Sequence, residues 1–191
     1  MPNWCNNYVE IKGPTQKLQA LSKAAKAGEL LNFMYPMPQE REQTEANGTE
    51  RPELVKKTGH SDWYSWRTTE WHTKWDVGEC HQNDIADGVL RLSFDTAWAP
   101  GTGAYENYLA ENQDVSIRAH YYEPGCDFMG TWDDYEDDCV TISEVTDEEL
   151  TTEYQHLDDY FGILESREMW REEQKEEENA NGSSGQGQKD H

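Results

Sequence analysis

Alternating apolar and polar residues predict β-strands at several places in the chain, because successive side chains of a strand point to opposite faces. The clearest segment is "GVLRLSFDTAW", where Leu90, Leu92 and Phe94 share one face and follow an Asp-Gly turn. "NYVEIKG" near the N-terminus is also rich in strand-forming residues and ends at Gly13-Pro14. The predicted strands cover about residues 7–12, 74–80, 88–96 and 114–121, with two short strands around an acidic turn at 133–138.

Apolar residues at helical spacing predict helices between these strands. In "PTQKLQALSKAAKAG", Leu18, Leu21 and Ala25 recur three or four residues apart, and Gly28 ends the segment. The segment "PGTGAYENYLAENQ" predicts a second helix over about residues 104–113.

An insertion of about residues 29–75 is predicted after the first helix. Residues 36–60 contain three prolines and few apolar anchors, which predicts a long irregular loop. The aromatic stretch "SDWYSWRTTEWHTKWDV" follows, and Ser61 or Asp62 is placed to cap a short helix.

The predicted order of strand, helix, strand, strand, helix and strand indicates an α+β fold of the ferredoxin-like βαββαβ type. Such a fold has an antiparallel sheet with its helices on one face, here followed by extra strands. Thr146 and Glu149 match a capping box that opens an amphipathic, acidic C-terminal helix. The expected organisation is a ferredoxin-like domain over 1–145, the acidic helix over 146–178 and a disordered, Gly/Ser/Gln-rich tail over 179–191.

The charge of the chain is concentrated in its C-terminal third. The formal net charge is -23, and residues 1–122 hold 17 Asp or Glu against 12 Lys or Arg. Residues 123–178 hold 21 Asp or Glu against three basic residues. Such a segment repels nucleic acids and membrane surfaces and attracts basic proteins, so direct nucleic-acid binding is not expected. No stretch approaches the roughly 20 apolar residues of a membrane span, and no signal-peptide pattern is visible, so a cytoplasmic protein is expected.

Five motifs occur in an order that resembles a known family. They are "MPNWCNNYVEIKG" at the N-terminus, "FMYPMP" at 33–38, "DWYSWRTTEWHTKWDV" at 62–77, "LSFDTAWAP" at 92–100 and "YYEPGCDFMG" at 121–130. Together they resemble a family of uncharacterised proteins encoded by phages and plasmids, with a ferredoxin-like domain. The resemblance covers about residues 1–145 and implies the fold, an origin in a mobile element and a bacterial host. It implies no catalytic residues, and the acidic helix beyond Val145 lies outside the shared pattern.

The sequence gives little support for a metal, cofactor or catalytic site. The nearest pair of possible metal ligands is Cys80-His81, which lacks the spacing of a zinc site. We therefore expect no metal and no cofactor. The four cysteines form no C-x-x-C pair and are expected to be buried free thiols. No nucleophile has a base at a recognisable spacing, so no catalytic residue is assigned.

The tryptophans leave two interpretations open. Most of them are expected to build the core, as large aromatic side chains commonly do, and Trp4 is expected to pack there as well. The alternative is an aromatic pocket covered by the 36–60 loop. The candidate pocket residues are Trp66, Arg67, Lys74, Asp95 and Trp98.

Three functions remain open at this point. The first is a non-enzymatic protein that binds a basic host or defence protein through an acidic surface, where carboxylates imitate DNA phosphates in an anti-defence or host-takeover role. The second is a small-molecule or nucleotide-binding enzyme that uses the Trp-rich pocket, and the third is a nucleic-acid-binding module. The acidic surface would comprise Asp133, Asp134, Glu136, Asp137, Asp138, Asp158, Asp159, Glu172, Glu173, Glu176, Glu177 and Glu178. Oligomeric state is not predicted.

Overall fold

The computed structural model describes residues 3–42, 44, 46 and 52–183. Contacts divide the chain into two compact units, Met1–Glu144 and Val145–His191, and each is described by itself.

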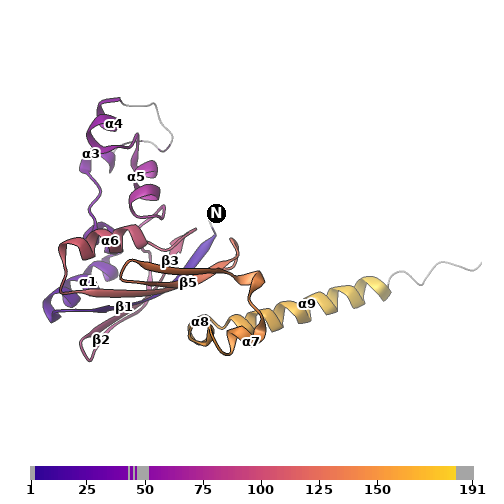
Figure 1. The fold of residues 1–191 in the computed structure, drawn as a ribbon. Helices are drawn as coiled ribbons and strands as arrows, with labels where there is room; N and C mark the ends of the chain where they lie inside the picture. Colours follow the sequence, from indigo (N-terminus) through magenta and orange to yellow (C-terminus); the bar gives the residue numbers. More distant parts are fainter. Residues whose placement is uncertain (1–2, 43, 45, 47–51, 184–191) are drawn as a thin grey trace, which may run out of the picture. The chain divides into compact units, whose positions relative to one another are not determined.

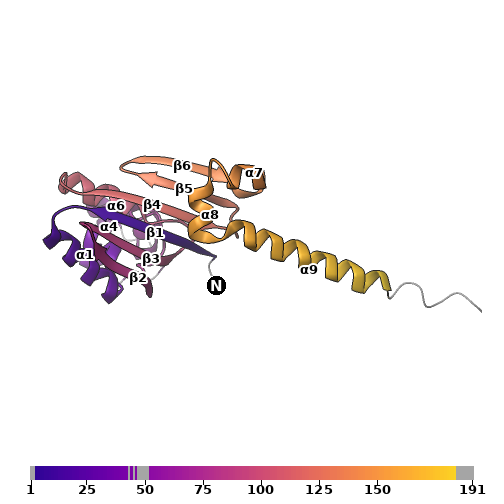
Figure 2. The same ribbon diagram turned by 90° about the horizontal axis from the view of Figure 1, so that it is seen from below.

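A six-stranded antiparallel sheet forms the centre of the first unit, with the order β2-β3-β1-β4-β5-β6 (Figure 2). β1 lies between β3 and β4, so Val9 is opposite Leu92 on one side and Ala119 on the other. The first four strands have the arrangement of a ferredoxin-like sheet, and β5 and β6 extend it beyond β4. The strands are β1 (Trp4–Lys12), β2 (Cys80–Ala86), β3 (Val89–Ala97), β4 (Ser116–Glu123), β5 (Phe128–Asp133) and β6 (Glu136–Thr141).

Two long helices, α1 (Thr15–Ala27) and α6 (Thr102–Glu111), pack on one face of this sheet (Figure 1). Alternate residues of β1 are buried against them, including Val9 and Ile11, because the period of a strand is two. α1 ends at Gly28, whose φ of 73° is a left-handed conformation that glycine adopts without a steric penalty. The predicted α+β, ferredoxin-like fold is confirmed.

The insertion between α1 and β2 is more helical than expected. It contains α2 (Leu30–Met34), α3 (Gln39–Glu42), α4 (Pro52–Thr58) and α5 (Trp63–Glu70). The prediction that residues 36–60 are irregular throughout is therefore wrong for α3 and α4; residues 43, 45 and 47–51 lie outside the described residues. Figure 1 shows α3, α4 and α5 gathered beyond α6, on the helix side of the sheet.

Two strand boundaries differ from the prediction. β1 begins at Trp4, three residues earlier than expected. The strand expected at 74–80 does not form in these described residues. Residues 71–79 are irregular, and β2 begins only at Cys80. Asp76 explains the difference, because its carboxylate accepts hydrogen bonds from the Leu31 and Asn32 amides and draws the segment toward α2. β2 itself is a polar edge strand and lacks a clear alternating pattern.

The second unit consists of three helices, α7 (Asp147–Leu150), α8 (Gln155–Phe161) and α9 (Ile163–Ser183). The predicted capping box of Thr146 and Glu149 is present at the start of α7. The single helix predicted over 146–178 is wrong, because Gly162 ends α8 with a φ of 60° and α9 begins after it. α9 continues to Ser183, so residues 179–183 of the expected disordered tail are helical, and residues 184–191 lie outside the described residues.

The buried residues of this unit are few. Leu150, Leu157 and Ile163 are nearly inaccessible to solvent, whereas α9 is exposed on almost all sides from Glu165 to Glu178. Among the described helices, none is both long enough and apolar enough to cross a membrane.

Candidate functional site

The acidic turn between β5 and β6 is held by its own carboxylates. Asp134 and Tyr135 have φ values of 42° and 82°, which is typical of the two-residue turns that join antiparallel strands. The Asp134 carboxylate accepts a 2.8 Å hydrogen bond from the Ile117 amide of β4. Asp133 accepts hydrogen bonds from Arg118, also on β4, at 2.8 Å from Nε and more closely from Nη2. These two carboxylates therefore fasten the extra hairpin to the sheet.

A third carboxylate of this hairpin is also engaged. The Tyr121 hydroxyl donates a 2.6 Å hydrogen bond to Asp137. Burial, followed by this hydrogen bond, raises the pKa of Tyr121 well above its ordinary value, so the hydroxyl keeps its proton and remains a donor. Asp138 and Glu136 are exposed. Of the five hairpin residues predicted to bind a partner, three thus have partners inside the first unit.

Some acidic residues of the second unit also stabilise its own helices. Asp158 accepts a 2.8 Å hydrogen bond from the Leu164 amide, near the start of α9. Asp147 lies 2.9 Å from Nη1 of Arg167 and 2.7 Å from Nη1 of Arg171, which joins α7 to α9. Hydrogen bonds from Arg171 and then Arg167 lower the pKa of Asp147 to about 2. Asp159 is exposed.

The end of α9 has a different character. Residues 172–178 contain five glutamates and Lys175, and every side chain in this stretch is exposed. At a rise of ~1.5 Å per residue, a net charge of -4 occupies about 10 Å of helix axis. This stretch, called the acidic end of α9 below, comprises Glu172, Glu173, Glu176, Glu177 and Glu178.

The tryptophans of the insertion divide between core and surface. Trp66 and Trp71 are 3% and 0% exposed, and the Trp71 indole donates a 2.8 Å hydrogen bond to the carbonyl of Tyr35. The Arg67 guanidinium lies 4.8 Å from the Trp71 ring centroid and 5.4 Å from that of Trp63. Trp66 and Arg67 thus contribute to the packing of the insertion, in line with the core interpretation.

Lys74 lies among three other aromatic rings. Its ammonium is 4.5 Å from the ring centroid of Trp75, 5.1 Å from that of Trp98 and 5.7 Å from that of Tyr64. Trp98 has a φ of 70°, which is strained for a residue with a side chain, and its amide donates a 3.0 Å hydrogen bond to the Asn3 carbonyl. The backbone at Trp98 therefore ties the start of β1 to the end of β3.

Beside this group lies a surface pocket of about 310 Å³. Of the five predicted pocket residues, Asp95 lines this pocket, whereas Trp66 is buried and Arg67, Lys74 and Trp98 take part in the ring contacts given above. The predicted grouping of all five around one pocket is not what these contacts show. The pocket, called the Trp4 pocket below, is lined by Trp4, Trp75, Asp76, Gly78, Glu79, His81 and Asp95.

Trp4 corrects one expectation about the N-terminal motif. Its side chain is 48% exposed and contacts Trp75, with 6.0 Å between ring centroids, so it does not pack in the core. The alternation of the following strand contains the signal for this placement. Cys5, Asn7, Val9 and Ile11 are buried, and Trp4 lies on the opposite face from them.

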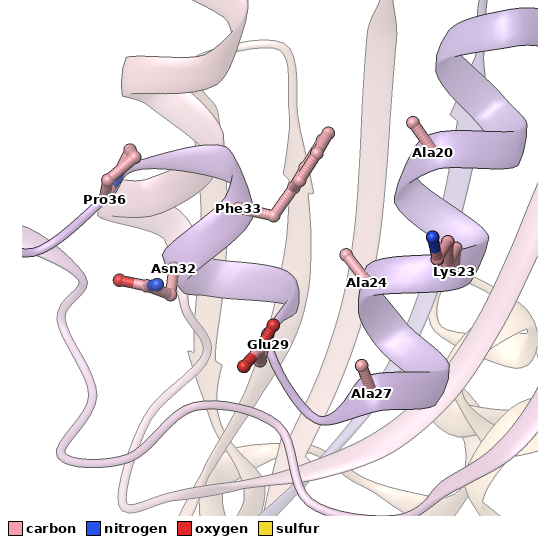
Figure 3. A pocket seen from close by; sticks show the side chains of 8 residues that line it. All are labelled: Ala20, Lys23, Ala24, Ala27, Glu29, Asn32, Phe33 and Pro36. Carbon is pink, nitrogen blue, oxygen red and sulfur yellow. The ribbon is translucent and has the colours of Figure 1, made fainter.

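A larger groove of about 560 Å³ lies between α1 and α2 (Figure 3). Figure 3 shows Ala20, Ala24 and Ala27 of α1 facing Phe33 of α2, with Lys23 beside them. Its lining also includes the polar residues Lys23, Glu29 and Asn32, and the Asn32 side chain already accepts a hydrogen bond from the Met37 amide. The groove therefore combines the apolar surface of three alanines and Phe33 with a few polar side chains.

The cysteines differ from the expectation that all four are buried. Cys5 is buried, Cys80 is partly buried, and Cys126 and Cys139 are exposed. Burial raises the pKa of Cys5 far above its ordinary value and that of Cys80 to about 11, so both thiols stay protonated near neutral pH and are poor nucleophiles. Within the described residues, no group of three or more His, Cys, Asp or Glu side chains is arranged to hold a metal ion.

Comparison with known proteins assigns the chain to a family. A family model described as the ferredoxin-like domain in Api92-like protein matches residues 70–179, which is more than half of the chain. The chain belongs to this Api92-like family. The match begins within the insertion, includes β2 to β6, and extends through α7 and α8 into α9. The expectation that residues beyond Val145 lie outside the family pattern is therefore wrong.

One solved structure is similar at a lower level. It is the crystal structure of the protein api92 from Yersinia pseudotuberculosis, 13% identical to this chain, and the alignment covers 74% of this chain and 98% of that one with a TM-score of 0.39. No curated protein matches the chain. The family assignment rests on the family model.

Proposed function

We propose that the chain is a non-enzymatic protein of a phage or plasmid that binds a basic host or defence protein through the acidic end of α9. The single observation that supports this proposal most strongly is the exposure of all five glutamates between Glu172 and Glu178. Asp147 and Asp158 form hydrogen bonds that stabilise the helices of their own unit. Among the described residues, none forms a comparable contact with these five glutamates.

The density of charge favours a basic protein as the partner. A net charge of -4 over about 10 Å corresponds to one charge per ~2.6 Å, and one DNA strand carries one per ~3.4 Å. A protein surface that binds a nucleic-acid strand through Lys and Arg would therefore meet a comparable local field on α9. The resemblance covers only two helical turns, so it suits a local basic patch better than a long duplex-binding groove.

The neighbouring side chains offer additional contacts. Met169 and Trp170 precede the glutamates and are 57% and 62% exposed. Large apolar side chains of this kind commonly serve as anchors in protein interfaces, whereas charges around them set the encounter rate and orientation. A partner with a basic surface and an apolar hollow would match this part of α9.

Capture from host lysate tests the proposal with three immobilised proteins. They are the unmodified chain, a variant with Gln at all five positions from Glu172 to Glu178, and a control with five neutral substitutions elsewhere: Glu53→Gln, Asp84→Asn, Asp87→Asn, Glu111→Gln and Glu144→Gln. We expect a basic protein to be retained by the unmodified chain and the control, released by salt, and lost with the α9 variant. Recovery of the same proteins by all three, or of none, would refute the proposal.

A further inference from the structure

The Trp4 pocket has aromatic walls that are open to solvent. Trp4 is 48% exposed although it is an indole at the first position of a central strand. Trp75 adjoins it, with ring planes inclined by 38°. The Asn3 carbonyl, one residue before Trp4, accepts the Trp98 amide, which fixes the backbone at this edge. The two rings therefore form a surface that the fold holds in place and does not bury.

Two carboxylates border these rings. Asp95 accepts a 2.7 Å hydrogen bond from the Asn6 side chain, and its other oxygen lies 3.6 Å from Nε2 of His81. Glu79 lines the same pocket and is exposed. Both groups are accessible acceptors with positions set by β3 and by the start of β2.

A third carboxylate, that of Asp76, already accepts hydrogen bonds from backbone amides. One of its oxygens accepts the Leu31 and Val77 amides at 2.8 Å, and the other accepts the Asn32 amide at 2.9 Å. Asp76 therefore has a structural role at the pocket, whereas Asp95 and Glu79 remain able to accept hydrogen bonds from a ligand.

One of these two rings, Trp75, already contacts a cation within the chain. The Lys74 ammonium lies 4.5 Å from the Trp75 centroid, within the range of a cation–π contact. This contact shows that the local environment tolerates a positive charge next to Trp75. The contacts of Lys74 are with Tyr64, Trp75 and Trp98 and do not include Trp4. The Trp4 ring is therefore the one available to a ligand cation.

We propose that the Trp4 pocket binds a small organic cation, an ammonium group on a short alkyl chain, with its charge against Trp4, Asp95 and Glu79. The volume of about 310 Å³ is at the lower end of small-molecule sites, which start at roughly 300 Å³. The apolar walls suit an alkyl chain, and the carboxylates favour a positive charge. A bare metal ion is disfavoured, because the described residues hold no suitable group of three ligands. This site lies in the first unit and does not depend on α9.

Titration of the full-length chain with choline and with putrescine tests the proposal. The readout is the set of indole N–H signals in NMR spectra, with Trp4→Phe and Trp75→Phe used to assign the two signals. We expect at least one of the two cations to shift both signals saturably. The uncharged carbon isostere of choline is expected to shift neither, because cation–π attraction requires the charge.

Two variants separate this site from general attraction to an acidic protein. Glu79→Gln combined with Asp95→Asn removes the two accessible carboxylates, and Asp84→Asn combined with Asp87→Asn removes two charges near the turn of the β2–β3 hairpin, away from the pocket. We expect the first pair to weaken binding at least about tenfold and the second pair to leave it within about twofold. The proposal is overturned if neither cation gives a saturable shift, if the isostere shifts the signals equally, or if both double variants bind alike.

Discussion

At the residue scale, the cysteines show how burial sets chemical reactivity. Cys5 lies on β1 and is inaccessible to solvent. Burial raises its pKa because a charged thiolate is poorly solvated among apolar groups. Cys126 and Cys139 are exposed. These differences determine which thiols a reagent can reach in the folded protein.

We predict that a disulfide reagent at pH 8 modifies Cys126 and Cys139 in the folded chain and leaves Cys5 unmodified until denaturant is added. Cys80, with a pKa raised to about 11, should react slowly because little of it is thiolate at that pH. Mass spectrometry of the modified peptides assigns each site. Rapid modification of Cys5 without denaturant would contradict the described core.

Gly103 gives a second residue-scale prediction. A Cβ at this position would lie 2.3 Å from the Glu70 carbonyl oxygen, so α6 approaches the end of α5 too closely for any side chain. Gly103→Ala should lower the free energy of unfolding by about 1–3 kcal/mol, measured by chemical denaturation. Gly78→Ala is the matched control, because nothing lies within 4 Å of its added Cβ. Equal stability of the two variants would contradict the close approach.

Single residues also mark where sequence reasoning fails. The pattern around Val77 predicts a strand at 74–80, but the hydrogen bonds of Asp76 to the Leu31 and Asn32 amides override it. These partners are more than 40 positions away, so no local pattern reveals them. The large indole of Trp4 favours a place in the core, but the alternation of Cys5, Asn7 and Val9 puts it on the opposite face of β1.

At the element scale, Asp76 attaches α2 to the segment before β2. Asp76→Ala leaves three backbone amides without their acceptor, which should cost about 1–3 kcal/mol of unfolding free energy. Asp76→Asn keeps one acceptor oxygen and should cost less. Chemical denaturation of both variants measures this order, and an unchanged stability of Asp76→Ala would show that α2 is held by other contacts.

The attachment of α7 to α9 depends on pH. Because Arg171 and Arg167 lower the pKa of Asp147 to about 2, the ionised carboxylate is favoured in the folded unit. Its stabilising effect is present above the ordinary value of about 3.9 and is lost as the pH falls toward 2. An NMR titration of the Asp147 carboxyl group measures this pKa.

Arg167→Gln combined with Arg171→Gln should return the Asp147 pKa to about 3.9. Lys175→Gln is the control, because Lys175 does not take part in the contacts of Asp147. An unchanged low pKa in the double variant would exclude the arginines as its cause.

Elements with strong periodicity were predictable, and short polar ones were not. α1 and β3 were predicted within one or two residues because Leu18, Leu21, Leu90 and Leu92 repeat at the period of their element. β2 is an edge strand of polar residues, and α3 and α4 lie in a proline-containing stretch. Gly162 divides the C-terminal helices through a backbone conformation that the amphipathic pattern alone does not indicate.

At the scale of the whole molecule, the sequence predicted an antiparallel sheet with the helices on one face, but not which carboxylates remain exposed. Asp133, Asp134 and Asp137 stabilise the β5–β6 hairpin, whereas the five glutamates from Glu172 to Glu178 face solvent. The Trp4 pocket could not be predicted either, because its residues come from β1, β2, β3 and the segment before β2. Such groupings depend on tertiary contacts.

The most direct test of the proposed function is the affinity of the captured basic protein for purified chain as a function of salt. For the unmodified chain, we predict that affinity falls steeply between about 0.05 M and about 0.5 M salt, because screening weakens contacts between exposed charges. The variant with Gln at the five α9 positions should bind at least about tenfold more weakly at low salt, with a shallower dependence. Equal affinity and equal salt dependence of the two proteins would contradict a binding role for the acidic end of α9.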